Sequence, residues 1–223
     1  MTRRLSVTWP DPRPFERRDG RPIRLLAVSD DVDPALEHAR NREAIGAVDL
    51  IIGCGDLSPA TLSFVGDAFH VPIVYVRGNH DRQGPWPTPP DIPPPSAGVD
   101  DRSLPGIPML LLPWTRFQDG DAHRDELGAW LQLVRAAPRL LRSRAPLLVV
   151  SHVPPRDLGD TPTDPYHVGY AAYRFLMDRL RPPLWLHGHT NPAAQADWRN
   201  EEGPTVAANV TGSVLVELLP PMA

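Results

Sequence analysis

Residues that commonly bind metal ions follow several short apolar runs in this 223-residue chain. Five of them come shortly after such a run: Asp30, Asp56, Asn79, His152 and His189. A buried carboxylate is costly by itself, and a divalent cation removes that cost by coordinating it. Two imidazole nitrogens together with carboxylate and amide oxygens suit Mn²⁺, Fe²⁺ or Zn²⁺ better than Ca²⁺. We therefore predict that all of these residues except Asp30 meet around one cation.

The apolar runs predict buried strands, because they are short, lack alternation and are bounded by turn residues. They cover residues 25–28, 50–52, 71–76, 147–150 and 184–186. Segments suited to amphipathic helices lie at 34–47, 60–69, 122–137 and 169–180. Alternating strands and helices indicate a largely parallel sheet, and ligands bind to such sheets at the carboxyl ends of the strands. The metal-binding candidates all lie at that edge.

The C-terminal part of the chain has a different pattern. Strands are expected at 193–198, 205–210 and 214–219, joined by turns at 200–203 and 211–212. Such tight turns favour an antiparallel second sheet. The expected fold class is α/β, a four-layer α/β/β/α sandwich of two mixed sheets flanked by helices, in a single domain over residues 1–223.

A proline-rich loop is expected at about 83–108. Its prolines exclude a helix, and proline at this density resists strand pairing. The loop begins just after Asp81, at the edge that carries the metal-binding candidates. It therefore either roofs the site, in which case Trp86 is the first residue to test, or faces solvent without a role.

The composition of the chain indicates its compartment and partners but not its reaction. With a net charge of −4 and a pI near 6.0, nothing indicates a surface for nucleic acid, which is expected only as a substrate. The single cysteine, Cys54, allows no internal disulfide and implies no oxidising compartment. No signal peptide and no membrane span are expected, which favours a cytoplasmic protein. The oligomeric state is left open.

The motifs occur in an order known from one family. They are Asp30, Gly55-Asp56, Gly78-Asn79-His80-Asp81, Ser151-His152 and Gly188-His189. From residue 23 to about 215, the chain resembles the calcineurin-like metallophosphoesterases. The resemblance implies two metals bridged by Asp56, with Asp30 on the first metal. It implies further that the second metal is completed by Asn79, His152 and His189, and that His80 contacts the phosphate and protonates the leaving oxygen.

Two positions depart from the family pattern, because Val32 and Asn191 stand where the family has the two histidines of the first metal. In one hypothesis, Asn191 contributes its amide oxygen and Asp31 or Asp33 supplies the other ligand. That oxygen-rich first site would favour Mn²⁺ or Mg²⁺. In a second hypothesis, only the second metal binds firmly. In a third, the metal centre is degenerate and the fold serves as a binding module.

Three residues near the motifs are candidates for supporting contacts. His187 is expected to hydrogen-bond a metal ligand or to touch the substrate. His167 lies before an expected helix and either borders the pocket or is an ordinary loop histidine. Asp81 either orients His80 or caps the turn that follows it.

The sequence therefore predicts a metal-dependent phosphoric ester hydrolase that works by attack of a metal-bound hydroxide on phosphorus. We expect one or two divalent ions and favour Mn²⁺, with Fe²⁺, Zn²⁺ and Mg²⁺ as alternatives. The expected substrate is a phosphate-ester small molecule or a nucleotide. A phosphodiester is preferred, because a monoester dianion benefits more from two firmly bound cations. The alternatives are a phosphomonoesterase and a non-catalytic interaction module on the same fold.

Overall fold

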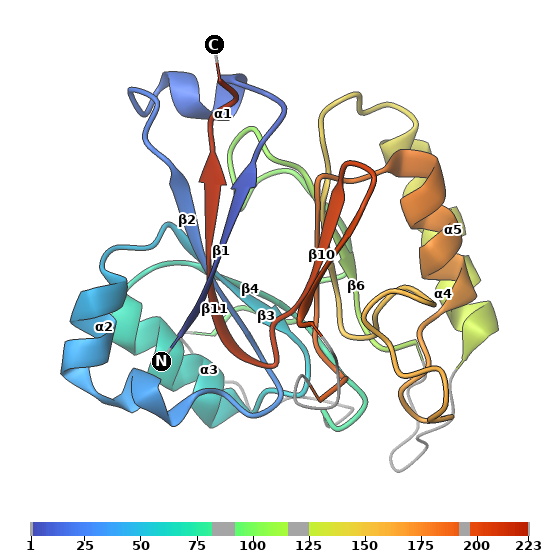
Figure 1. Ribbon diagram of the computed structural model, residues 1–223, viewed down its shortest axis with the longest axis horizontal. Coiled ribbons are helices and arrows are strands. Elements are labelled where there is room, and N and C mark those ends of the chain that lie inside the picture. The colour runs from blue at the N-terminus through green and yellow to red at the C-terminus, as the bar shows by residue number, and fades with distance from the viewer. Residues whose placement is uncertain (1, 82–91, 116–124, 192–196, 223) are drawn as a thin grey trace.

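Two β-sheets face each other, and helices cover the outer side of each sheet (Figure 1). The computed structural model describes residues 2–81, 92–115, 125–191 and 197–222. The first sheet has the order β1 (Arg3–Thr8), β11 (Gly212–Leu219), β2 (Ile23–Ser29), β3 (Leu50–Cys54) and β4 (Ile73–Val76). The second has the order β5 (Gly98–Asp100), β6 (Met109–Leu112), β7 (Leu148–Ser151), β8 (Leu184–His187), β10 (Thr205–Asn209) and β9 (Arg199–Glu202).

Both sheets are mixed, as expected from the sequence. In the first sheet β2, β3 and β4 are parallel, whereas β11 runs antiparallel to β2. In the second sheet β6, β7, β8 and β10 are parallel, and the edge strands β5 and β9 are antiparallel to their neighbours. The parallel strands are buried on both faces, which explains why their sequences are continuous apolar runs without alternation.

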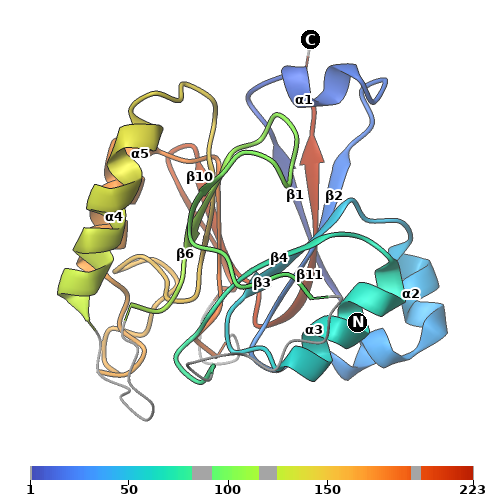
Figure 2. The ribbon, with the colours of Figure 1, turned by 180° about the vertical axis from the view of Figure 1, so that it is seen from behind.

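The helices complete the four layers. The 3₁₀ helix η1 (Pro34–Glu37), α2 (Ala39–Ile45) and α3 (Pro59–Phe69) pack on the first sheet, whereas α4 (Glu126–Leu140) and α5 (Ala171–Leu180) pack on the second (Figure 2). A short helix, α1 (Arg13–Glu16), follows β1. One apolar cluster fills the space between the sheets, and two more lie under the helix layers. The four-layer α/β/β/α prediction is confirmed. None of the helices in the described ranges is long and apolar enough to cross a bilayer.

Local sequence signals explain where the helices begin. Ser58 caps α3, because its hydroxyl accepts a hydrogen bond from the Thr61 amide at 3.0 Å, and Pro59 occupies the first helical position. The helix expected at 34–47 is instead two short helices, since His38 takes an extended conformation between them. Asn41 donates from its side-chain amide to the carbonyl of Ala35, which satisfies part of the end of η1 and allows the break.

The predicted arrangement of the C-terminal strands is wrong. β9 begins at Arg199, after the expected strand at 193–198, most of which lies outside the described residues. β10 pairs with β8 and β9 in the second sheet, but β11 crosses over and lies between β1 and β2 in the first. The Thr211-Gly212 step therefore connects two sheets. A local turn signal does not distinguish such a crossing from a hairpin, because the partner strands are chosen by long-range packing.

The proline-rich segment is partly ordered by pairing and packing. Residues 98–100 form β5, against the expectation that the segment resists pairing, because this short stretch is free of proline. Leu104 and Ile107 are buried in the cluster between the sheets, and Ile92 is buried under α3. This part of the segment therefore belongs to the core. Trp86 and the suggested roof over the site lie outside the described residues.

Candidate metal centre

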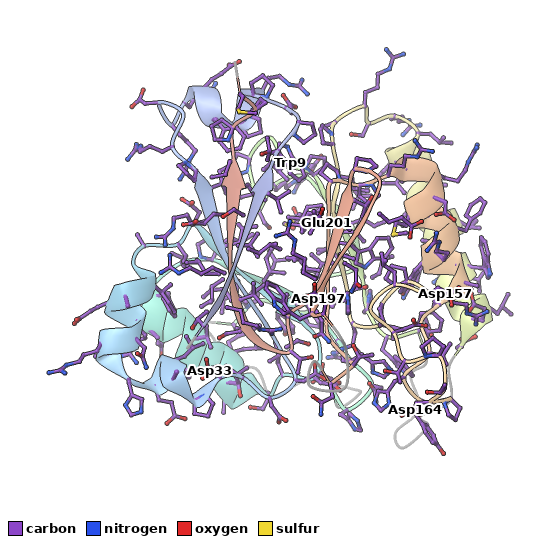
Figure 3. The ribbon with its side chains drawn as sticks, viewed as in Figure 1. Trp9, Asp33, Asp157, Asp164, Asp197 and Glu201 are labelled. Atoms are coloured by element: carbon purple, nitrogen blue, oxygen red, sulfur yellow. The ribbon has the colours of Figure 1, made fainter. Side chains whose placement is uncertain are left out.

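The predicted ligands come together where strand ends of the two sheets meet. β2, β3 and β4 end beside the ends of β7 and β8, and the His152 ring reaches across to the Cys54 carbonyl at 2.8 Å. This end of the molecule lies opposite the C-terminus, towards which β11 runs (Figure 1). In Figure 3, Asp164 marks a loop at this end, and Trp9 lies towards the other end.

Four side chains direct ligand atoms at one small volume. The Nε2 atom of His152 lies 2.8 Å from Oδ1 of Asn79 and 3.4 Å from Oδ2 of Asp56. The Nδ1 atom of His189 lies 3.1 Å from the same Asn79 oxygen and 3.2 Å from Nε2 of His152. The structure thus brings together Asp56, Asn79, His152 and His189, which are far apart along the chain.

Backbone carbonyls determine which nitrogen of each histidine is available. Nδ1 of His152 is hydrogen-bonded to the carbonyl of Cys54, and Nε2 of His189 to the carbonyl of Tyr166, each at 2.8 Å. A carbonyl only accepts hydrogen bonds, so these nitrogens carry protons. In the neutral rings, the lone pairs therefore lie on Nε2 of His152 and Nδ1 of His189, which face each other. Such an arrangement holds histidine ligands in the tautomer that binds metal.

The distances fit a single cation. With ligand bonds of about 2.0–2.2 Å, two ligand atoms of one ion lie roughly 3 to 3.5 Å apart. The four separations among the oxygen and nitrogen atoms given above run from 2.8 to 3.4 Å. Two nitrogens and two oxygens are donors suited to a first-row divalent ion. The residues present therefore fit one such ion.

The electrostatics also favour a positive charge at this point. Burial lowers the pKa of His152, but the nearby Asp56 carboxylate outweighs it and raises the pKa to about 9. Burial, aided by the neighbouring His152, lowers the pKa of His189 to about 3. Without a cation, one extra proton on His152 thus gives the two rings a single positive charge. A divalent ion would supply the charge that this proton otherwise provides.

The backbone around Asp56 is shaped by Asp81. The Asp81 carboxylate accepts hydrogen bonds from the amides of Gly78 (2.7 Å), Asp56 (2.9 Å) and Leu57 (3.0 Å). It thus joins the turns after β3 and β4, and none of the hydrogen bonds found among the described residues links it to His80. A Cβ on Gly78 would lie 2.1 Å from Oδ1 of Asp56, so only glycine allows this approach. Of the two roles considered for Asp81, orienting His80 and capping a turn, the structure supports the second.

Three of the predicted ligands have left-handed backbone conformations. The φ angles are 54° for Asp30, 53° for Asp56 and 70° for His189. Residues other than glycine adopt this region at a cost, and such strain concentrates at functional sites. The surrounding contacts maintain it here, since the Asp56 side chain accepts a hydrogen bond from the His80 amide at 2.8 Å.

Asp30, the predicted ligand of the first metal, has different surroundings from the four converging side chains. Asp30 lies close to Asp56 and His152, with ligand atoms within 4.8 Å of one another. However, its Oδ2 atom accepts hydrogen bonds from the His189 amide at 3.1 Å and the Thr211 hydroxyl at 3.0 Å. Asp30, Asp56 and His152 thus form a group that could hold a metal ion, although Oδ2 of Asp30 is also hydrogen-bonded within the chain.

The residues at and near the positions of the missing histidines have different surroundings. Val32 packs against the apolar cluster under α2 and α3. Asp33 accepts a hydrogen bond from the Ala35 amide at 2.8 Å and caps η1. Asp31 and Asn191 are exposed. The oxygen-rich first site stays a prediction.

The remaining candidates take different positions. His80 is at the surface, with 81% of its side chain exposed and Nε2 4.0 Å from Oδ2 of Asp56. The His167 ring lies 5.1 Å from the His189 ring, and its Nδ1 is 2.6 Å from Asp164, so it borders the centre. His187 is fully buried, and its Nε2 atom lies beside Gly159. Burial lowers its pKa to about 4.

Sequence reasoning missed two residues of the centre. Trp114 is buried, and its ring lies 6.3 Å from the ring of His152 and 5.6 Å from that of His189, so it supports both. The apolar run 109–112, which forms β6, could have indicated a further strand that ends just before Trp114. Thr211, which bonds to Asp30, gave no local signal because its position depends on the crossing from β10 to β11.

The chain is similar to a known family and to several solved structures. The family model described as calcineurin-like phosphoesterase matches residues 27–192. One solved structure has a TM-score of 0.56 at 15% identity, covering 86% of this chain and 91% of that chain. The protein TT1561 of Thermus thermophilus has a TM-score of 0.53 at 15% identity, with 86% and 90% covered. A dimetal phosphatase from Danio rerio, LOC 393393, has a TM-score of 0.48 at 12% identity, with 85% and 87% covered.

A comparison with curated proteins finds no match for this chain. The two structural likenesses above 0.5 are at low identity and show the fold alone. The family match, in contrast, extends over well more than half of the 223 residues and includes Asp30, Asp56, His152 and His189. The chain therefore belongs to the calcineurin-like phosphoesterase family.

Proposed function

We propose that the protein is a metal-dependent phosphodiesterase with one firmly held cation. The observation that carries the proposal is the facing pair of histidine nitrogens, Nε2 of His152 and Nδ1 of His189, which lie 3.2 Å apart with an Asn79 oxygen close to both. Each ring is held by a hydrogen bond to a carbonyl, so the arrangement is ready for an ion before the ion arrives. Membership of a phosphoesterase family supplies the reaction class.

The four converging side chains would hold the ion: Asp56, Asn79, His152 and His189. When bound, it supplies a Lewis acid that polarises a phosphoryl oxygen and neutralises developing charge. Trp114 packs against both histidine rings and keeps them oriented. Asp81 holds the turns that present Asp56. These supporting residues thus form the buried side of the centre, and His80 lies on its exposed side.

We assign the leaving-group proton to His80. Its amide donates to Asp56 at 2.8 Å, which fixes the backbone beside the centre, while the ring projects into solvent where a substrate would approach. A positioned general acid typically contributes about 10²–10⁴-fold to the rate. Its exposure fits a group that must reach a substrate oxygen.

The difference between the two halves favours one ion and a diester. Asp30 is engaged by the chain itself, and Val32 lies in an apolar cluster. A phosphodiester carries one negative charge and depends less on a second cation than a monoester dianion does. We favour Mn²⁺, because the donor set is half oxygen. We also retain the prediction of a cytoplasmic protein that acts on a phosphate-ester small molecule or nucleotide.

The test is a combined measurement of metal content and turnover. We expect about one Mn²⁺ per chain by elemental analysis, and hydrolysis of bis(p-nitrophenyl) phosphate in preference to p-nitrophenyl phosphate. His80→Ala should lower kcat by about 10²–10⁴-fold while the metal content stays unchanged. His38→Ala is the matched control, because His38 is an exposed histidine at the N-cap of α2 and is not part of the proposed centre.

Different results point to different conclusions. Preference for the monoester would replace the diesterase proposal with a phosphomonoesterase. Full activity in His80→Ala would remove the assigned proton donor. No turnover with any divalent ion, despite bound metal, would overturn the enzyme proposal and favour the interaction module.

A further inference from the structure

Helix α4 is apolar on its outer face as well as on its inner face. Ala129, Leu133 and Ala136 are buried against the second sheet. On the opposite side of the helix, Leu127 is 68% exposed, Leu131 43% and Val134 66%. These positions follow the i, i+4, i+7 spacing of a single helical stripe. A surface helix normally has a polar outer face, and a helix that is apolar all round is typically buried.

Helix α5 extends this apolar surface. Phe175 is 50% exposed, and its ring lies 5.2 Å from the ring of Trp130, which is itself 36% exposed. The two helices lie side by side on the outer side of the second sheet, and no described element covers them (Figures 1 and 2). We call the set Leu127, Trp130, Leu131, Val134 and Phe175 the outer helix face.

The area of the outer helix face is close to what a dimer requires. Taking about 150–250 Å², the range for aromatic side chains, as an upper value for all five residues, the exposed fractions sum to at most roughly 500 Å². A standard interface buries about 800 Å² on each partner, of which about 65% is apolar in homodimers, or roughly 520 Å². The aromatic pair at its edge is the kind of group that dominates binding energy.

The charges beside the outer helix face favour one orientation of a second copy. The first turn of α4 carries Glu126, and its C-terminal half carries the exposed Arg135 and Arg139, followed by Arg142. The Glu126 carboxylate is engaged within the chain, because it accepts hydrogen bonds from the amides of Ala171 and Ala172. If two copies of α4 pack antiparallel, the arginines of the two helices lie apart, and the helix dipoles oppose. A parallel pairing would bring the arginines together. The pattern thus matches a two-fold axis, where one surface must complement itself.

We propose that the protein forms a two-fold homodimer through the outer helix face, with the two α4 helices antiparallel. This inference is independent of the metal centre and of the proposed reaction. The occupant is a second copy of this chain.

The first experiment measures the mass in solution. Sedimentation equilibrium of the metal-loaded full chain should give twice the chain mass of 24.7 kDa. Leu131→Glu should shift it to a single chain, with unchanged far-UV circular dichroism. Phe64→Glu is the matched control, because Phe64 is 37% exposed on α3 in the other helix layer, and this variant should stay dimeric.

The second experiment locates the contact. Cys54 is the single cysteine and is fully buried, so Val134→Cys introduces the one accessible thiol. A thiol-specific bifunctional crosslinker should join two chains of this variant and should not join chains of Phe64→Cys. A monomeric wild type that co-sediments with anionic lipid vesicles would overturn the proposal and assign the face to a membrane surface. A dimer that persists in Leu131→Glu and is not crosslinked through residue 134 would also overturn it.

Discussion

The two halves of the metal centre are made of similar residues but are arranged differently. Around His152 and His189, each ring presents a lone pair to a shared volume because a backbone carbonyl holds its other nitrogen. Around Asp30, the carboxylate is directed at the chain's own donors, the His189 amide and the Thr211 hydroxyl. The hydrogen-bond partners of the non-coordinating atoms therefore decide whether a side chain is oriented to bind a metal.

The largest expected effect is a difference between the two aspartates in metal binding. Asp56→Ala should weaken Mn²⁺ binding by more than about 100-fold, since even residues that only support ligands contribute roughly 10–100-fold. Asp30→Ala should weaken it by less than about 10-fold, the lower end of that range. Isothermal titration calorimetry measures both affinities. Equal losses in the two variants would show that the halves act as one site.

The next effect is a gain of a second ion. Val32→His together with Asn191→His restores the two histidines that the family pattern has on the Asp30 side. The metal content measured by native mass spectrometry should rise from one to two Mn²⁺ per chain. The control is Val32→Ala with Asn191→Ala, which should remain at one. If the wild type already holds two ions, the asymmetry proposed for the centre is wrong.

A smaller effect is expected for Asp81, which holds the turns around Asp56. Asp81→Ala leaves the amides of Gly78, Asp56 and Leu57 without their acceptor. An unsatisfied buried donor costs about 1–3 kcal/mol, so we expect the free energy of unfolding in urea to fall by about 3 kcal/mol. Asp81→Asn keeps one carbonyl acceptor and should lose less. An unchanged free energy of unfolding in Asp81→Ala would contradict the support role.

The smallest effect is expected on the Asp30 side. Thr211→Val keeps the shape of the side chain and removes the hydroxyl that bonds to Asp30 at 3.0 Å. Loss of this hydrogen bond should lower the free energy of unfolding by about 1 kcal/mol. Mn²⁺ affinity should not change, because Asp30 is outside the proposed ligand set. A large fall in affinity would place Thr211, and with it Asp30, in the ion's surroundings.

The sequence predicted the parts of the fold that carry strong local patterns. All five continuous apolar runs correspond to strands, β2, β3, β4, β7 and β8, because burial on both faces requires apolar residues throughout. β1 (Arg3–Thr8), in contrast, alternates buried and exposed residues at the edge of the first sheet and was missed. β11 was predicted as a strand but placed in the wrong sheet, since no local feature identifies its neighbours.

By itself, the sequence determined which residue types stand at the strand ends, and therefore that two imidazoles, an amide and carboxylates were available. Only the tertiary structure decided which atoms of these residues face one another. That choice depends on contacts between distant segments, such as His152 with the carbonyl of Cys54 and Asp30 with Thr211. Hydrogen bonds of this kind form only after the sheets have packed, so no local pattern encodes them.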